Sequence, residues 1–439
     1  MAGMEIQHTD TSGVSDDVLR THISSLSEYR DELKAVRKES TYNTPESLLH
    51  LPLDESLLSN IKIIADKLKV SNLTNVVVVG MGGSVRGLRA VYDLLADTSS
   101  AQLHLVDTIS SDHISKVVTD LSEKIDNLKQ VAICIVSKSG QTIETNSNAN
   151  ILLTRLEEIF PDSDVMSRTV VVSQSGTQLT KVTMEAGGLS VVVPEQVPGR
   201  FSVFSAAGLI PLQLVGIDVS ALQNGAKTML EACLSGRAAA DPAAALAAIL
   251  FAHTEENIRI INHTFFSSEA RGFGSWLEQL FSESLGRRTN RRGEPVFSGL
   301  YPVTTIAPED LHADLQLQLA GAKNFFTIFV EERSARGDLN AVVSSDSLLP
   351  SDLEGLAGKS LADIRQASSA AVKAAFRDAG RPFVSITVDA FSPERVGQLL
   401  LLEELIVLYL AELLEVNPFN QPQVEAYKDQ LKDLLNISN

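Results

Sequence analysis

The pattern of apolar and polar residues is clearest where four consecutive valines, 76–79, run into the turn 80–84, Gly-Met-Gly-Gly-Ser. After the turn, apolar residues recur at a helical spacing, at positions 85, 88, 91, 94 and 95. A continuous β-branched run is typical of a strand buried on both faces of a parallel sheet, and the recurrence is typical of an amphipathic helix. This stretch therefore predicts a strand, a tight turn and a helix.

Strand and helix patterns alternate on both sides of this stretch. Short apolar runs predict strands at 102–106, 131–136, 169–172 and 189–193, and helical patterns lie at 54–68, 112–128 and 144–160. Strands that alternate with helices are typical of a doubly wound parallel sheet. Residues 45–215 are therefore interpreted as one α/β domain.

A second α/β pattern occupies residues 216–439. It predicts strands at 259–265, 301–306, 325–330 and 382–388, and helices at 238–254, at 275–285 and from Ser392, which is followed by a proline that suits a first helical turn. Residues 1–44 predict a helical arm, and the polar segment 331–359 predicts a surface loop. Two similar units indicate an ancient duplication, although no repeat is visible residue by residue.

Charge and composition narrow the class of protein. The chain has 439 residues, 44% of them hydrophobic, and a net charge of −18, which disfavours binding to nucleic acid or to acidic membranes. The two cysteines and eight histidines form no metal-binding pattern, so neither a metal nor a cofactor is expected. The N-terminus has no apolar signal core, and segment 396–416 carries Glu403, Glu404 and Glu412. These features predict a cytoplasmic protein in which 396–416 is a buried helix with a polar edge rather than a membrane span.

Two turns at predicted strand ends suit an anion. The turn 80–84 lacks the glycine spacing of a dinucleotide fingerprint, but Ser84 and the amides at a helix N-terminus suit a single phosphate. Segment 137–142 adds three hydroxyls and Lys138, and it follows another strand at the same predicted sheet edge. The alternatives are a tight strand–helix corner and a polar loop in which Thr142 caps the next helix.

Other residues are candidates for acid–base chemistry. Arg200 follows a glycine after the fifth strand, where it either stabilises developing oxyanion charge or lies on the surface. Gln279 and Glu283 are four residues apart and share a helix face. Partial burial would raise the pKa of Glu283 toward that of a general base, whereas a helical glutamate is ordinarily solvated. The basic cluster 286–292 is interpreted as a solvated loop.

The last two candidate segments carry little signal alone. His312 has a structural role by default, and the tail around Gln421 and Lys428 predicts a C-terminal docking helix. Together, however, the motifs resemble the glucose-6-phosphate isomerase (phosphoglucose isomerase) family, which is built from sugar isomerase (SIS) domains. Six motifs follow the family's order from about residue 45 onwards, at 80–84, 137–142, 199–202, 283–286, His312 and 417–428.

The resemblance implies an α/β fold of two flavodoxin-like, doubly wound SIS domains with the site between them. It implies that Glu283 moves a proton between C2 and C1 of the sugar, and that Arg200 stabilises the cis-enediol(ate). His312 and Lys428 would assist ring opening. The resemblance assigns contacts with the sugar and its phosphate to Gln279, Gln421, Gly83, Ser84, Ser137, Lys138, Ser139 and Thr142.

The implied substrates are glucose 6-phosphate and fructose 6-phosphate, as in glycolysis and gluconeogenesis, and the implied assembly is a homodimer that shares His312 across its interface. Two alternatives are an enzyme that also accepts mannose 6-phosphate and a sugar-phosphate sensor without catalysis. The chain departs from the family at Arg287, where lysine is common, and in the histidine segment, which lacks the usual Ser-x-Gly-Gln. These departures bear on substrate preference more than on the reaction.

Overall fold

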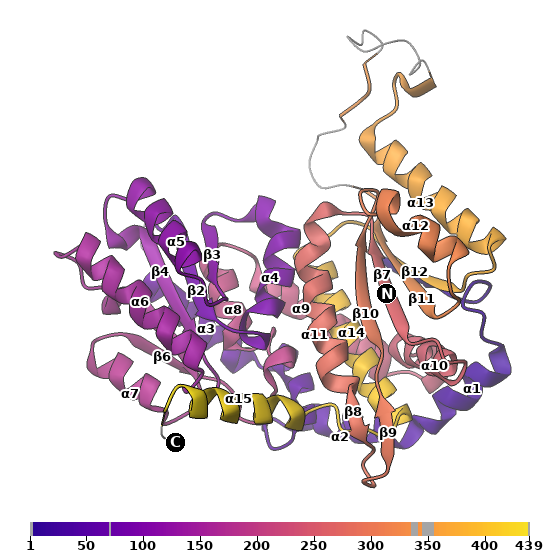
Figure 1. The fold of residues 1–439 in the computed structure, drawn as a ribbon, viewed down its shortest axis with the longest axis horizontal. Coiled ribbons are helices and arrows are strands. Elements are labelled where there is room, and N and C mark those ends of the chain that lie inside the picture. The colour runs from indigo at the N-terminus through magenta and orange to yellow at the C-terminus, as the bar shows by residue number, and fades with distance from the viewer. Residues whose placement is uncertain (1–2, 70–71, 335–340, 345–354, 438–439) are drawn as a thin grey trace.

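Residues 3–69, 72–334, 341–344 and 355–437 are described by the computed structural model, and they form two α/β domains that lie side by side (Figure 1). The first domain contains a parallel sheet with the strand order β3-β2-β4-β5-β6. This is the flavodoxin-like order, as expected. Its strands are β2 (Asn75–Gly80), β3 (Gln102–Val106), β4 (Val131–Val136), β5 (Thr169–Ser173) and β6 (Leu189–Val192).

Helices cover this sheet on both faces, as the alternating pattern predicts. Valines 76–79 of β2 are completely buried, which explains why that strand has no polar face. Asp54 begins the first of the covering helices by accepting a hydrogen bond from the backbone of Leu57 at 2.9 Å. The helices are α3 (Glu55–Leu68), α4 (Gly83–Leu95), α5 (Ser111–Lys124), α6 (Ile143–Ile159), α7 (Gln178–Glu185) and α8 (Ala206–Leu214).

The second sheet has the order β1-β12-β11-β7-β10. Four of its strands are parallel, namely β7 (Ile260–Phe265), β10 (Tyr301–Ile306), β11 (Phe325–Glu332) and β12 (Phe383–Val388). The edge strand β1 (Met4–Gln7) runs antiparallel to β12 and was not predicted. The predicted helical arm follows it as α1 (Asp16–Ser25) and α2 (Ser27–Lys38). The N-terminus is therefore part of the second domain's sheet.

The segment 331–359 differs in part from the predicted surface loop. Its first two residues, Glu331 and Glu332, continue strand β11 and are at least partly buried. Residues 335–340 and 345–354 of this segment lie outside the described residues.

The predicted helix at 396–416 is α14 (Pro393–Leu413), which packs closely against α9 (Val219–Leu234). A Cβ atom on Gly225 or on Gly397 would lie 1.9 or 2.0 Å from a backbone carbonyl oxygen of the facing helix, so the bare glycines permit the approach. Glu403 and Glu404 are buried with the rest of the helix, so the prediction that they form a polar edge is wrong. Within the described ranges, no helix is long and apolar enough to cross a membrane.

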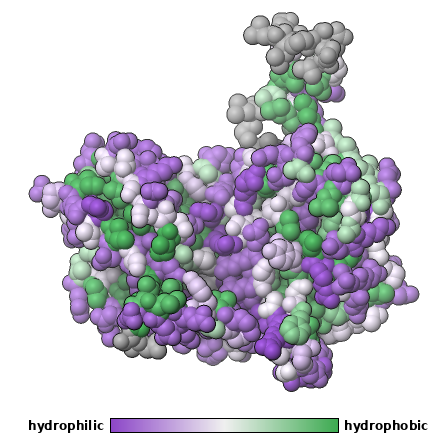
Figure 2. Space-filling model, viewed as in Figure 1, coloured by the Kyte–Doolittle hydropathy of each residue, from purple (hydrophilic) through white to green (hydrophobic). Residues whose placement is uncertain are grey.

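The remaining helices and strands lie outside the two five-stranded sheets. Helix α15 crosses toward the first domain and contributes no buried residue (Figure 1). The face drawn in Figure 2 is largely hydrophilic, including the recess between the domains. The other helices and strands are α10 (Pro242–Glu255), α11 (Arg271–Leu285), β8 (Arg287–Thr289), β9 (Pro295–Ser298), α12 (Leu311–Ala320), α13 (Leu361–Asp378) and α15 (Pro422–Leu434). Short 3-10 helices lie at Pro45–Leu53, Ala96–Thr98, Leu128–Gln130, Met166–Arg168, Gly199–Phe201, Ala238–Ala240 and Ser268–Ala270.

Candidate active site

The glycine-rich turn after β2 lies against the segment that carries Arg200. Gly82 adopts a φ of +53°, and Gly83 begins helix α4. A Cβ atom on Gly83 would lie 2.4 Å from the carbonyl carbon of Gly199, a distance that no side chain tolerates. Glycine is therefore required at position 83, because two backbones meet there.

The two predicted anion turns converge on one small hollow. Ser84 and Lys138 both line it, together with Gly199 and Ser202. Lys138 is half-buried, and burial lowers the pKa of its ammonium group, while Glu195 opposes this shift and the charge of Arg200 adds to it. The two turns thus meet at the carboxyl edge of the first sheet, where open α/β sheets bind ligands.

The segment 137–142 is held by its own hydroxyl groups. Ser137 donates a hydrogen bond from Oγ to Oγ1 of Thr142 at 3.1 Å, and the Oγ of Ser139 accepts from the backbone of Gln141 at 3.2 Å. Thr142 stands at the N-cap position of α6 but makes no capping hydrogen bond. The interpretation of Thr142 as a simple helix cap is therefore wrong.

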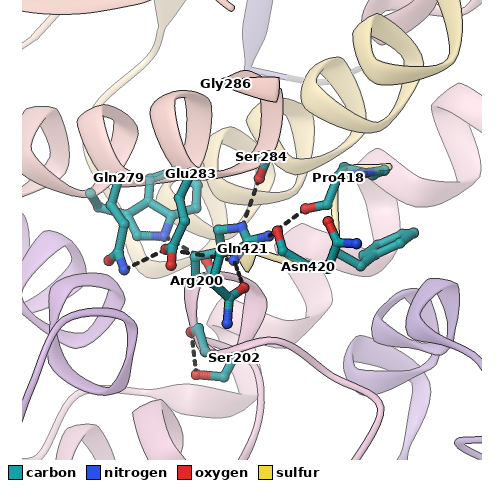
Figure 3. Close-up of polar contacts among 12 residues, drawn as sticks. Arg200, Ser202, Gln279, Glu283, Ser284, Gly286, Pro418, Asn420 and Gln421 are labelled. Atoms are coloured by element: carbon teal, nitrogen blue, oxygen red, sulfur yellow. Dashed lines mark hydrogen bonds and ion pairs between the residues drawn. The ribbon is translucent and has the colours of Figure 1, made fainter. Parts of the chain in front are cut away.

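Arg200 is buried, with 2% of its surface exposed, so the surface alternative is also wrong. Its guanidinium donates to Oγ of Ser284 at 2.8 Å, to Oε1 of Gln421 at 3.1 Å and to the carbonyl oxygen of Pro418 (Figure 3). Burial lowers the pKa of Arg200 to about 10, against the opposing effect of Glu283. The group remains a cation at neutral pH, and it is shielded from water.

Glu283 completes a pair of opposite charges with Arg200. One carboxylate oxygen, Oε2, lies 3.5 Å from the Nη1 atom of Arg200, and Gln279 donates to the same oxygen at 2.9 Å. The Glu283 side chain is 22% exposed, as the predicted partial burial requires. Both residues lie on one face of α11 (Figure 3). They line a second hollow together with Gly82 and Val424. The carboxylate is thus oriented by one hydrogen bond and one ion pair, and it still faces open space.

The C-terminal tail reaches this pair through Gln421. Its amide donates to Oε1 of Glu425 at 3.4 Å, and Lys428 donates to the same oxygen at 2.8 Å. Lys428 is about half-exposed on α15. A continuous set of contacts therefore links Glu283 to Lys428, although the lysine itself points at Glu425.

His312 is not brought into this group. It lies on the exposed side of α12, beyond the end of β10. Across the described part of the chain, no hydrogen bond or ion pair joins its imidazole to Glu283 or Arg200. His312 is therefore not part of this group within the described chain.

Several site residues were missed from the sequence. Ser284 and Trp276 both hold Arg200, the latter by donating from its indole nitrogen to the Arg200 carbonyl at 3.2 Å. Arg287 is buried at 8% exposure, so the interpretation of the whole basic cluster as a solvated loop is wrong. The available signals were its position directly after the glycine that caps α11 and the lysine that the resembling family commonly has there.

The fold and the site define a two-domain α/β protein with anion-type turns on one sheet and a carboxylate–guanidinium pair between the domains. Among the described residues, no group of three or more histidine, cysteine, aspartate or glutamate side chains is arranged to hold a metal ion. A family model described as phosphoglucose isomerase matches residues 65–437. The chain belongs to the phosphoglucose isomerase family.

Relatives agree with this assignment over most of the chain. A probable glucose-6-phosphate isomerase of Haloarcula marismortui is 31% identical over 368 residues, which cover 83% of this chain and 79% of that protein. A glucose-6-phosphate isomerase of Methanocaldococcus jannaschii is 30% identical over 365 residues, with 83% and 85% covered. Among solved structures, a hypothetical protein from Thermus thermophilus has a TM-score of 0.87 at 26% identity and covers 98% of this chain and 99% of that one.

Proposed function

We propose that this chain interconverts glucose 6-phosphate and fructose 6-phosphate. The observation that carries the proposal is the Glu283 carboxylate 3.5 Å from the buried guanidinium of Arg200, in a member of the phosphoglucose isomerase family. An aldose–ketose isomerisation moves a proton between adjacent carbons and develops negative charge on the oxygens. A carboxylate base beside a desolvated cation meets both requirements.

In the proposed reaction, Glu283 accepts the proton from C2 of the open-chain aldose and returns it to C1. The hydroxyl proton on the C2 oxygen is lost, and the C1 oxygen gains a proton. The product is therefore the isomeric ketose, with no net gain or loss of atoms. Arg200 stabilises the negative charge of the cis-enediol(ate) between the two transfers. Gln279 holds the base in place through its 2.9 Å hydrogen bond.

The phosphate anchors the substrate away from the reacting carbons. We assign this anchoring to Ser84 and Lys138, which line one hollow, to the start of α4 at Gly83 and to the hydroxyls of segment 137–142. Binding of the remote phosphate dianion orients the sugar. Part of the free energy of this binding thereby lowers the barrier to proton transfer.

We further propose a homodimer in which His312 of the partner subunit completes each site and, with Lys428, assists ring opening. Two unpartnered surfaces support this proposal. Helix α15 buries none of its residues and exposes 58% of Tyr427 and 81% of Leu434. Near the edge strand β10, Phe297 and Tyr301 are 76% and 74% exposed. Apolar surfaces of this kind mark protein interfaces.

A coupled assay tests the reaction. Fructose 6-phosphate is supplied, and a dehydrogenase specific for glucose 6-phosphate reports the product through reduction of its nicotinamide cofactor. Turnover is expected, and its absence would overturn the proposal. Mannose 6-phosphate in the same assay shows whether the enzyme is a dual isomerase, whereas binding without turnover would indicate a sensor. A cytoplasmic location is part of the proposal, because the substrates are intermediates of sugar metabolism in that compartment.

Mixing two inactive variants tests the shared histidine. Glu283→Gln and His312→Ala homodimers are allowed to exchange subunits, so that each heterodimer has one site with both native residues. Activity should recover to about one quarter of the wild-type value after a 1:1 exchange, since half of the dimers are mixed and each has one working site. If sedimentation shows exchange without recovered activity, His312 does not act across the interface.

A further inference from the structure

Arg287 makes an unusual set of contacts for a residue of a basic surface cluster. Its Nη1 atom donates to the carbonyl oxygens of Glu283 at 2.9 Å and Gly286 at 2.8 Å. Its Nε donates to the carbonyl oxygen of Asn417 at 2.8 Å, and its Nη2 donates to that of Asn420 at 2.6 Å. One side chain therefore joins the C-terminal end of helix α11 to the turn 417–421.

The two elements joined in this way carry residues that the substrate contacts in the proposed site. Helix α11 carries Glu283, and the turn 417–421 ends in Gln421, which accepts a hydrogen bond from Arg200. Arg200 and Arg287 both donate to the carbonyl of Asn420, at 3.4 and 2.6 Å. Only a planar group with five donors can satisfy several carbonyls in fixed directions, which is the property of a guanidinium.

The charge of Arg287 also acts on Glu283. Burial lowers the pKa of Arg287, and the neighbouring Glu283 carboxylate opposes that shift. Arg287 therefore adds a second positive charge near the carboxylate that Arg200 already faces.

We propose that Arg287 is a positioning residue for the isomerisation: it fixes the turn 417–421, which ends in Gln421, against the end of helix α11 that carries Glu283. The proposal rests on the proposed function for its catalytic consequence. The holding of the turn is a separate property that can be measured without substrate. The residue touches neither the reacting carbons nor the phosphate in this assignment, since all its hydrogen bonds go to backbone carbonyls.

Two substitutions separate the geometry from the charge. Arg287→Met removes both, whereas Arg287→Lys keeps the charge and loses the planar set of donors. The matched controls are Arg288→Met and Arg288→Lys, because Arg288 is the next residue and its side chain is exposed. All four variants are compared with the wild type as full chains by circular dichroism, thermal unfolding, kcat and KM as functions of pH, and amide hydrogen exchange of the peptide that contains 417–421.

For Arg287→Met we expect kcat to fall about 100-fold, as for a misplaced catalytic geometry, and exchange of the turn to quicken at least about 10-fold. The fall in kcat should exceed any rise in KM, because the displaced residues face the reacting carbons rather than the phosphate. Arg287→Lys should lower kcat by about 3- to 10-fold and give intermediate exchange. Both Arg288 variants should match the wild type.

Wild-type exchange of the turn and wild-type kcat in a folded Arg287→Met variant would overturn the proposal. If that variant does not fold, Arg287→Lys decides: wild-type kcat and exchange would overturn it, and slower turnover with faster exchange supports it. If the wild type turns over no hexose phosphate, the proposed function fails. The exchange comparison between positions 287 and 288 still decides whether Arg287 holds the turn.

Discussion

The guanidinium of Arg200 lies 3.5 Å from the carboxylate of Glu283, although the two residues come from different domains. Arg200 follows the last strand of the first sheet, and Glu283 lies in the last turn of helix α11 in the second domain. Neither domain alone supplies the pair. Trp276, also on α11, donates to the Arg200 carbonyl and so fixes the backbone of one partner to the helix of the other.

Glu283→Gln should abolish most catalysis while leaving binding intact. The amide has the same shape and can still accept the hydrogen bond from Gln279, but it cannot take a proton from carbon. We expect kcat to fall by at least about 1,000-fold and KM to change by less than about threefold. Steady-state kinetics with fructose 6-phosphate measure both values. A variant that keeps more than a tenth of wild-type kcat would remove Glu283 from its role as the base.

Ser84→Ala should have the opposite signature. The hydroxyl lines the hollow assigned to the phosphate and lies apart from the Glu283–Arg200 pair. Loss of one hydrogen bond to a charged group costs about 1.5–3 kcal/mol, so KM should rise by about 10- to 100-fold with little change in kcat. The same variant should bind inorganic phosphate more weakly in a competition assay. If kcat falls by the same factor as KM rises, Ser84 does not act through phosphate binding alone.

The dependence of KM on pH should report Lys138. Its pKa is lowered by burial, so its ammonium loses its proton at a lower pH than an ordinary lysine and phosphate binding weakens as the pH rises. KM should therefore climb on the alkaline side, and Lys138→Met should show a high KM that no longer depends on pH there. Arg200, with a pKa lowered to about 10, remains in that variant, so the alkaline fall in kcat should persist. Identical KM profiles in the two proteins would contradict this assignment.

Gly83→Ala should damage the site by a different route. The new Cβ would meet the carbonyl carbon of Gly199 at 2.4 Å, and relief of this clash displaces either the phosphate turn or the segment that carries Arg200. We expect kcat/KM to fall about 100-fold, because small displacements at a reacting site are costly. Gly236→Ala is the control, since a Cβ there meets nothing within 4 Å. Wild-type kinetics in Gly83→Ala would show that the two backbones separate without consequence.

Local patterns allowed much of this architecture to be predicted. The valine run before the glycine turn, the helix spacing of Gln279 and Glu283 and the cap at Ser392 all depend on near neighbours, and each is found in the structure. Such features are fixed by backbone sterics and by burial of one face, which short sequences express directly. The family resemblance added the order of the motifs.

Features that depend on distant partners could not be predicted. Strand β1 has four residues and is stabilised by pairing with β12, more than 370 positions away, so its own sequence carries little signal. The burial of Arg287 depends on carbonyls of the turn 417–421. The exposed position of His312 follows from the placement of α12, which no neighbouring residue in the sequence indicates.

Glu404 should make stability depend on pH. It is completely buried in α14, neither carboxylate oxygen has a hydrogen-bond partner within the described structure, and burial raises its pKa well above the usual 4.5. Above the pKa that the Glu404 carboxyl has in the unfolded chain, the native state therefore binds more protons at this site than the unfolded state does. Stability falls as the pH rises, until the raised native pKa is passed. Glu404→Gln replaces the group with a neutral amide of similar shape and removes this dependence.

The two proteins should unfold at similar temperatures near pH 5, and the variant should unfold at least about 2 °C higher at pH 8, since each unit of unequal titration is worth 1.36 kcal/mol. Thermal unfolding followed by circular dichroism across this range measures the difference. Glu412→Gln on the same helix is the control, because Glu412 is partly exposed and paired with Arg291. Parallel curves for Glu404→Gln and the wild type would mean that Glu404 is not held in its protonated form. A gap that widens with pH for Glu404→Gln alone would locate the titration at this buried carboxyl.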